Sequence, residues 1–119
     1  MWIFLNNAFI SVVAPAPGSP AEGEDKLVVR ARTSGDLARV FGDDVIEQRS
    51  HGRDYAFRAT VARKRVADAI AEQVRQIKYT NFKDSVEETD RHNAYVGVWH
   101  AMNSFQHARG HGGAYPPLR

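Results

Sequence analysis

The 119-residue chain contains no cysteine, which excludes disulfide bonds and metal sites built from thiolates. It also lacks a strong charge of either sign, because 16 lysines and arginines stand against 14 aspartates and glutamates, for a formal net charge of +2. So small an excess predicts nucleic-acid binding only where the basic residues cluster. Apolar residues make up 43% of the chain, which is enough for one globular domain with a single core.

Long hydrophobic runs are absent as well, and the most apolar segment is the N-terminal "MWIFLNNAFISVVAPAPGSPA". Its apolar run followed by small residues is typical of a signal peptide, but no lysine or arginine precedes the run and Asn6-Asn7 divides it. The run is also too short to span a membrane. Two strands joined by an Asn-Asn turn, or one irregular strand, explain residues 2–13 better, so we expect a cytoplasmic protein without a membrane segment.

Apolar alternation predicts further strands. After a connection over 14–25 with three prolines and two glycines, "KLVVRAR" (26–32) alternates apolar and polar residues as a half-buried strand does. Residues 43–61 predict a hairpin with its turn near 50–53. On its second arm the alternation places one set of side chains on a common face: Tyr55, Phe57, Ala59 and Val61.

Helical periodicity predicts three helices. "TSGDLARVFG" (33–42) is typical of a short helix, with Thr33 or Ser34 as its N-cap and an acidic residue, Asp36, in its first turn. A longer helix follows over 62–77, where apolar residues recur every three or four positions. The last helix, over 91–106 with Thr89 or Asp90 as cap, has an apolar face of Tyr95, Val98, Trp99, Met102 and Phe105.

This order of elements predicts an α+β fold, in which a mainly antiparallel sheet of about four strands carries two or three helices on one face. A split β-α-β relative of the ferredoxin-like class fits the order best. We expect one domain over residues 1–106 and a flexible tail over 107–119, where three glycines and two prolines follow. A small open sheet leaves an edge strand, which makes a homodimer plausible.

Histidines and serines form no catalytic or metal motif. The five histidines include no H-E-x-x-H pattern, and neither a G-x-S-x-G turn nor a glycine-rich phosphate loop is present. His92 and His100 lie on one face of the predicted last helix, and either could serve as the base of a small hydrolase if a carboxylate lay beside it. We expect no metal, no cofactor and no enzymatic activity, with this hydrolase as the least favoured alternative.

Three arginines form the first candidate site. Arg30, Arg32 and Arg58 are out of phase with the apolar residues of their strands, so they share the polar face of the sheet if the strands are neighbours. With Lys83 nearby they could bind an anion. They could equally form a structural ion-pair network with Asp54 and Asp84.

Arg63, Lys64 and Arg65 form the second basic group, in the first turn of the predicted helix over 62–77. The helix dipole disfavours cations at that end, so the cluster either marks an anion or nucleic-acid contact or simply points into solvent. Pairing with Asp68 along the helix is the structural alternative.

The connection "KYTNFKDSV" (78–86) carries aromatic and charged residues where a plain loop is expected. Tyr79 and Phe82 can anchor it, Asn81 can close an Asx turn, and Ser85 has capping-box spacing from a later glutamate. Only Lys83 lacks a structural explanation. The segment is therefore either an anchored helix connection or a loop with a binding role.

Four short motifs, "VRAR" (29–32), "DYAFR" (54–58), "YTNFKDSV" (79–86) and "VW" (98–99), follow an N-terminal "MWIF". As a set they resemble a widespread family of small bacterial proteins of unknown function, over roughly residues 1–106. The resemblance implies a compact α+β fold and no established activity. It places on motif positions Arg30, Arg32, Asp54, Tyr55, Arg58, Tyr79, Asn81, Phe82, Lys83 and Trp99, whereas residues 63–65 and the His-Gly tail lie outside the pattern.

The sequence thus favours a non-enzymatic binding or regulatory module. Its binding surface would bring together Arg30, Arg32, Arg58, Lys83, Asn81 and Tyr55 against an acidic protein surface or a small anion. An inhibitor of a defence complex, encoded on a mobile element, is one version of this hypothesis, although no residue carries it. The alternative is a nucleic-acid-associated protein that uses Arg63, Lys64 and Arg65 with the sheet arginines and binds with a steep salt dependence.

Overall fold

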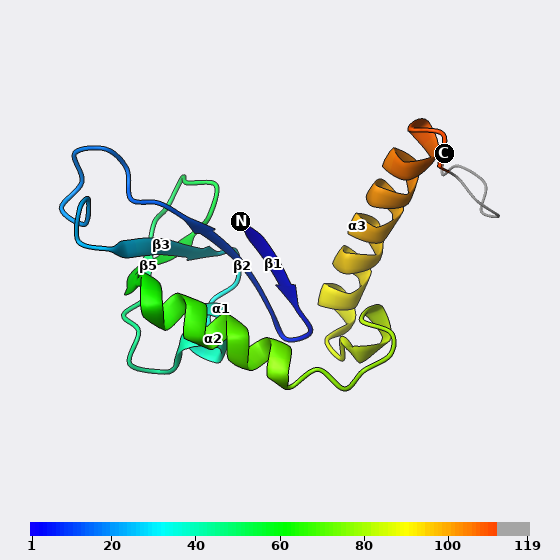
Figure 1. The fold of residues 1–119 in the computed structure, drawn as a ribbon, viewed down its shortest axis with the longest axis horizontal. Helices are drawn as coiled ribbons and strands as arrows, with labels where there is room; N and C mark the ends of the chain where they lie inside the picture. Colours follow the sequence, from blue (N-terminus) through cyan, green and yellow to red (C-terminus); the bar gives the residue numbers. More distant parts are fainter. Residues whose placement is uncertain (112–119) are drawn as a thin grey trace. The chain divides into compact units, whose positions relative to one another are not determined.

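The computed structural model describes residues 1–111, and the chain divides into two compact units that are described separately (Figure 1). The first unit, Met1–Lys78, holds the sheet and two helices, and the second, Tyr79–Arg119, holds a short 3-10 helix and one long α-helix. The single domain expected over 1–106 stays a prediction. In the part of the chain that is described, no helix is both long and apolar enough to cross a membrane.

The sheet is antiparallel throughout, with the strand order β1-β2-β3-β5-β4. Its strands are β1 (Trp2–Leu5), β2 (Ala8–Val13), β3 (Lys26–Ala31), β4 (Gln48–Arg49) and β5 (Phe57–Ala62). The Asn6-Asn7 turn separates β1 from β2, so the hairpin is the correct one of the two predicted alternatives. The structure confirms the α+β class, with five strands in place of about four.

The central part of the sheet is a split β-α-β unit. Helix α1 (Asp36–Phe41) connects β3 to β4, and both strands are antiparallel to β5, which lies between them. β3 and β4 are therefore parallel to each other. Helix α2 (Arg63–Arg75) follows β5 directly, as in the ferredoxin-like class. The difference is that β2, which precedes β3 in the chain, occupies the place that a strand after the second helix takes in that class.

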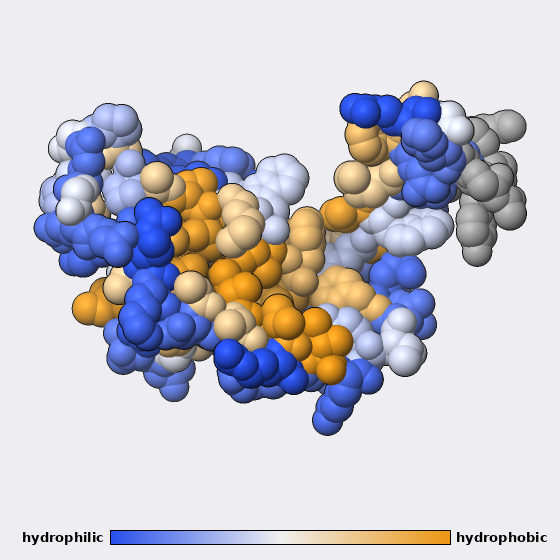
Figure 2. All heavy atoms as spheres, viewed as in Figure 1, coloured by the Kyte–Doolittle hydropathy of each residue, from blue (hydrophilic) through white to orange (hydrophobic). Residues whose placement is uncertain are grey.

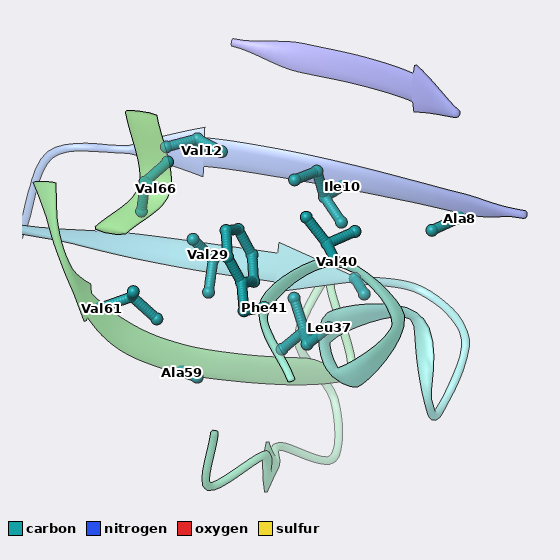
Figure 3. Close-up of a cluster of buried hydrophobic side chains, with 11 residues drawn as sticks. Ala8, Ile10, Val12, Val29, Leu37, Val40, Phe41, Ala59, Val61 and Val66 are labelled. Atoms are coloured by element: carbon teal, nitrogen blue, oxygen red, sulfur yellow. The ribbon is translucent and has the colours of Figure 1, made fainter. Parts of the chain in front are cut away.

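The core lies between the sheet and the two helices. Leu37, Val40 and Phe41 of α1 point toward β2 and β3, as Figure 3 shows. Val66 of α2 completes the cluster on the same face. The sheet contributes Ala8, Ile10, Val12, Val29, Ala31, Ala59 and Val61, all on one side of the pleat. Burial of each large apolar side chain contributes about 1.5–3 kcal/mol, so this face determines how the strands align.

Helix α1 starts one or two residues later than its sequence signals predict. Gly35 occupies the N-cap position with φ of 92°, so the prediction of Thr33 or Ser34 as N-cap is wrong. A left-handed backbone favours glycine there, and the hydroxyl of Ser34 instead donates to Glu47 at 3.1 Å. The expected acidic residue of the first turn is Asp36.

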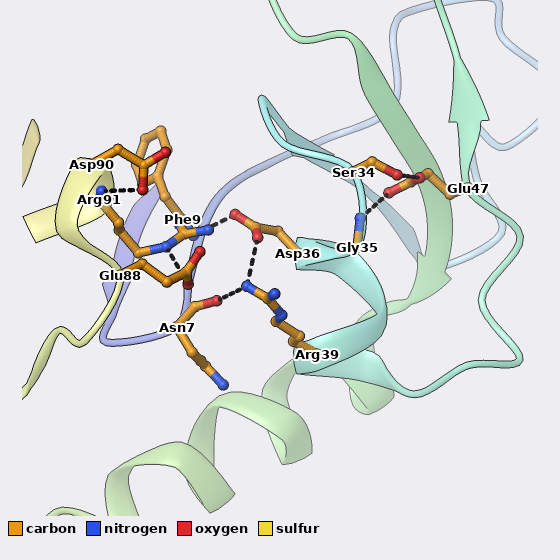
Figure 4. A network of polar contacts seen from close by, with 10 residues as sticks. All are labelled: Asn7, Phe9, Ser34, Gly35, Asp36, Arg39, Glu47, Glu88, Asp90 and Arg91. Atoms are coloured by element: carbon orange, nitrogen blue, oxygen red, sulfur yellow. Dashed lines mark hydrogen bonds and ion pairs between the residues drawn. The ribbon is translucent and has the colours of Figure 1, made fainter.

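Asp36 links helix α1 to the β1–β2 hairpin. Its side chain is only 1% exposed, and its Oδ2 accepts a hydrogen bond from the Phe9 backbone N–H at 3.0 Å. Arg39 lies 3.6 Å from the same carboxylate and also donates to the carbonyl of Asn7 at 2.8 Å (Figure 4). The buried charge is therefore neutralised and hydrogen-bonded, as burial requires.

The second unit is built on helix α3 (Thr89–Ala108), which extends two residues beyond the predicted end. Its N-cap residue is Glu88, not Thr89 or Asp90, and no side chain closes the cap. Arg91 donates to Glu88 at 3.0 Å (Figure 4). Most of the tail predicted over 107–119 lies outside the described residues, since these end at 111.

The 78–86 connection includes the 3-10 helix η1 (Lys83–Ser85) and is anchored within the second unit. The ring of Phe82 stacks on Tyr95 with centroids 5.7 Å apart, and Tyr79 lies 5.6 Å from Phe82. The Ser85 hydroxyl donates to the Phe82 carbonyl at 2.6 Å, so it does not act as the predicted cap of the next helix. The aromatic anchors therefore have a structural role.

Replacing Leu37 by alanine should lower the free energy of unfolding by about 2–5 kcal/mol, because the side chain is fully buried between α1 and the sheet. Urea unfolding measures the loss. Ile46→Ala is the matched control, since Ile46 is 81% exposed and its truncation should change stability by less than about 0.5 kcal/mol. Equal losses in the two variants would contradict the placement of Leu37.

Candidate anion-binding site

Arg30 and Arg58 face each other across β3 and β5, on the side of the sheet opposite α1 and α2. Their Cα atoms are register partners, and their neighbours in each strand point into the core. Nη2 of Arg30 donates to the hydroxyl of Ser11 at 2.7 Å, and Ser11 is its partner on the adjacent strand β2. The expectation that these arginines share the polar face is confirmed, because their strands are neighbours.

Tyr55 fixes two of the three arginines. Cζ of Arg30 lies 4.4 Å, and Cζ of Arg32 lies 4.2 Å, from the centroid of its ring. The tyrosine is 2% exposed, so these cation–π contacts are partly shielded from water and contribute about 1–2 kcal/mol each. The ring thereby holds both guanidiniums beside each other.

The position of Tyr55 differs from the predicted alternation. The residue precedes β5, in the connection between β4 and β5, and its ring contacts arginines of the polar face. It therefore does not share the core face of Phe57, Ala59 and Val61. Alternation of side chains holds only where the backbone is extended, and that begins at Phe57.

Positive charge exceeds negative charge on this face. Asp54 pairs with Arg32 at 3.1 Å, but both side chains are at least half exposed, so the pair contributes little. Burial lowers the pKa of Arg58, and the neighbouring positive charges of Arg53 and Arg30 lower it further, with Asp54 acting in the opposite direction. Arg58 still carries its proton at neutral pH. Burial is the largest cause of the lowered pKa, and the negative charge of Asp54 offsets it only in part.

Two of the arginines also keep unused hydrogen-bond donors. The Nε–H groups of Arg30 and Arg58 are buried and have no hydrogen-bond partner among residues 1–111. An unsatisfied buried donor costs about 1–3 kcal/mol. The alternative of a network with Asp54 therefore accounts for Arg32 but not for the other two. Carboxylates and phosphates are the groups that guanidiniums bind best, through charge-assisted hydrogen bonds.

Lys83 and Asn81 belong to the second unit and are described within it. Nζ of Lys83 lies 5.4 Å from the ring of Trp99. The side-chain carbonyl of Asn81 accepts a hydrogen bond from the backbone N–H of Asp84 at 3.2 Å, which is the local turn that the sequence predicts. Their participation in the arginine site stays a prediction.

Each cation of the 63–65 group has its own carboxylate. Arg63 pairs with Asp25 at 2.8 Å and Lys64 with Asp68 at 2.7 Å, as the structural alternative expects for the lysine. Arg65 contacts both carboxylate oxygens of Asp44, at 2.7 and 3.1 Å, and donates to the Phe41 carbonyl. A nucleic-acid role for these residues stays a prediction, and these pairs supply no unmatched charge for it.

The histidines take structural or exposed positions. Nδ1 of His92 lies 2.8 Å from the carbonyl oxygen of Lys83, and His100 lies exposed beside the ring of Trp99 at 5.2 Å. Across residues 1–111, no three histidine, aspartate or glutamate side chains come close enough to hold a metal ion. The geometry gives neither histidine a carboxylate partner in the described chain.

Two hollows are present elsewhere on the surface. One, of about 470 Å³, is lined by side chains of α3 and the residues after it, including Trp99, Met102 and Phe105. The other, of about 430 Å³, lies along β5 between Val45 and Arg65. Neither includes Arg30 or Arg58, whose site is a surface of the sheet.

Two contributors to the site escape sequence reasoning. Ser11 accepts a hydrogen bond that orients Arg30, and the positive charge of Arg53 lowers the pKa of Arg58. The place of Ser11 beside Arg30 comes from the register of β2 with β3. The alternation of "AFISVV" could have indicated that Ser11 lies on the polar face. Arg53 lies in a turn, and no pattern in the sequence indicates where its charge acts.

Comparisons of the chain with family models, with curated proteins and with solved structures find no match. No relative therefore supports the assignment of the site, which rests on the distances, burial and charges of this chain's own residues. The resemblance to a family of small bacterial proteins stays a prediction.

Arg58→Met should leave the free energy of unfolding unchanged or raise it by up to about 1 kcal/mol. The substitution removes a like charge placed directly opposite Arg30 and keeps an unbranched side chain that covers the same part of the sheet up to the δ position. Urea unfolding at neutral pH measures the change. A loss above about 1 kcal/mol would show that Arg58 stabilises the fold through a structural network, in place of serving a ligand.

The Asp44–Arg65 pair predicts a pH dependence of stability. Arg65 lowers the pKa of Asp44 below its usual 3.8, mainly through its hydrogen bond, and burial opposes the shift. A depressed folded-state pKa contributes stability that is present above 3.8 and lost as the pH falls through the lower value. The stability difference between the native chain and Asp44→Asn should therefore be constant near neutral pH and shrink in acid.

Urea unfolding of both proteins at a series of pH values measures this difference. Asp43→Asn, one residue away, controls for the simple loss of a negative charge. A difference for Asp44→Asn that is the same at neutral and at acidic pH would contradict a role for the ion pair.

Proposed function

We propose that the protein is a non-enzymatic binding module whose arginine face, formed by Arg30, Arg32 and Arg58, takes an anionic partner. One observation carries this proposal. The two guanidiniums lie opposite each other, and their buried Nε–H groups donate a hydrogen bond to no residue among 1–111. Such an arrangement is unfavourable without a ligand, because like charges repel and buried donors are left unsatisfied. A bound anion would relieve both effects.

The contrast with α2 supports this reading. There, Arg63, Lys64 and Arg65 are each paired with a carboxylate. The chain thus pairs the three exposed cations at the start of α2 with carboxylates, whereas no ion pair is present at the half-buried Arg30 and Arg58 among residues 1–111. Charged groups that are left without a partner in this way are expected at functional sites.

The partner's chemistry is that of a carboxylate or a phosphate group, because both accept paired hydrogen bonds from guanidinium. An acidic surface of another protein and a small anion are the two sources that the sequence favours. In this proposal the module acts in the cytoplasm. Inhibition of a defence complex would be one use of such a surface.

Nucleic acid is the second candidate, and Trp2 favours it. The indole belongs to the same face of the sheet as the arginines, since Trp2 pairs with Ser11 across β1 and β2, and it is 67% exposed. Exposed aromatic rings beside cations are typical of surfaces that bind single strands.

Inorganic tripolyphosphate should bind to the native chain in low-salt calorimetry, and Arg30→Met or Arg58→Met should weaken the binding by about 10- to 100-fold. The loss corresponds to one charge-assisted hydrogen bond of about 1.5–3 kcal/mol. Arg63→Met is the matched control, because its guanidinium is exposed and paired with Asp25, and it should bind like the native chain.

Three results would count against the arginine face. They are no binding of tripolyphosphate, equal binding by all variants, and a larger loss in Arg63→Met than in Arg58→Met. The folding of each variant is verified by its unfolding curve, so that a lost site is distinguished from a lost fold.

A further inference from the structure

Trp2, Ser11, Arg30 and Arg58 form one straight row across four strands. Trp2 pairs with Ser11, Ser11 with Arg30, and Arg30 with Arg58, so their side chains emerge on the same face of the sheet. The row begins at an exposed indole on β1 and reaches a guanidinium on β5, where Gln48 of β4 is the next register partner. Cross-strand register alone creates this arrangement, because the four residues are far apart in the sequence.

The spacing along the row separates an aromatic end from a cationic end. Neighbouring strands lie about 4.8 Å apart, so the backbone of Trp2 is about 10 Å from that of Arg30 and about 14 Å from that of Arg58. Ser11, the residue between them, is small and fully buried. The row therefore presents an aromatic surface and two cations on one face of the sheet, with a small residue between them.

The aromatic end has its own support. The ring of Phe9 lies edge-on to the indole of Trp2, with centroids 6.5 Å apart, and fixes one side of it. Figure 2 shows apolar side chains gathered in the first unit, where β1, β2 and α2 lie in that view. An indole that is held at its edge and exposed elsewhere presents a flat surface to a partner.

We infer that the ligand of this face is a single-stranded nucleic acid, with a base stacked on Trp2 and phosphates bound by Arg30 and Arg58. The inference rests on the proposed function, of which it specifies the ligand. A duplex would offer the phosphates but keeps the faces of its bases covered, and an acidic peptide offers a flat ring to the indole only where an aromatic residue stands near its carboxylates. A single strand offers an open base face and a phosphate at every nucleotide, which matches both ends of the row.

Fluorescence anisotropy of a labelled oligonucleotide of about 12 nucleotides and mixed sequence tests the inference at low salt. Trp2→Leu should raise the dissociation constant by about 5- to 150-fold, whereas Trp2→Phe, which keeps an aromatic face, should restore most of the affinity. Trp99→Leu, on helix α3, is the matched control and should bind like the native chain. Arg58→Met should lower the slope of log affinity against log salt by about 0.7.

The possible outcomes separate this inference from the proposed function. Equal binding by Trp2→Leu and the native chain, or equal affinity for a duplex of the same length, would overturn base stacking and leave an anion site. Binding of tripolyphosphate without binding of the oligonucleotide would overturn the inference and leave the arginine face in place. If neither probe binds, both proposals are wrong. A loss in Trp2→Leu that Trp2→Phe reverses, with weaker binding to the duplex, supports single-strand binding.

Discussion

The register between β3 and β5 is the constraint on which the rest of the first unit depends. Helices α1 and α2 require Val29, Ala31, Ala59 and Val61 on the inner face, and the pleat then forces Arg30 and Arg58 onto the outer face, opposite each other. A shift of one residue in either strand would exchange apolar and charged side chains. The hydrophobic core therefore holds two like charges together that would otherwise separate, and it can do so because core burial outweighs their repulsion.

The arginine face is stabilised only in part by its own neighbours. Tyr55 holds two guanidiniums through its ring, and Ser11 accepts one hydrogen bond from Arg30. Asp54 serves Arg32, while the pKa of Arg58 is lowered by burial and by neighbouring positive charge. These contacts orient the guanidiniums and leave their capacity for an anion unused. Orientation before binding is what makes a small surface site effective, because little side-chain freedom is lost when the ligand arrives.

Prediction from the sequence succeeds for those elements whose conformation is set by residues close to them in the chain. The Asn6-Asn7 turn, the alternation of residues 26–32, the periodicity of α2 and the aromatic anchors at Tyr79 and Phe82 all depend on neighbouring residues. It fails where a long-range contact decides. Ser34 donates to Glu47, so Gly35 begins α1 in its place. Tyr55 leaves the expected face because Arg30 of β3 and Arg32, which follows β3, contact its ring. The two-residue strand β4 is too short to have a pattern.

The sequence by itself determined which side chains are apolar, which segments are extended or helical, and that Arg30, Arg32 and Arg58 lie out of phase with the core residues. These properties follow from residue spacing and backbone propensity, which are local. Only the tertiary structure decided that Arg30 faces Arg58, that Trp2 and Ser11 extend the same row, and that Arg63, Lys64 and Arg65 are paired with carboxylates while the Nε–H groups of Arg30 and Arg58 have no partner among residues 1–111. Strand register and carboxylate partners come from residues distant in the chain, and no local pattern encodes them.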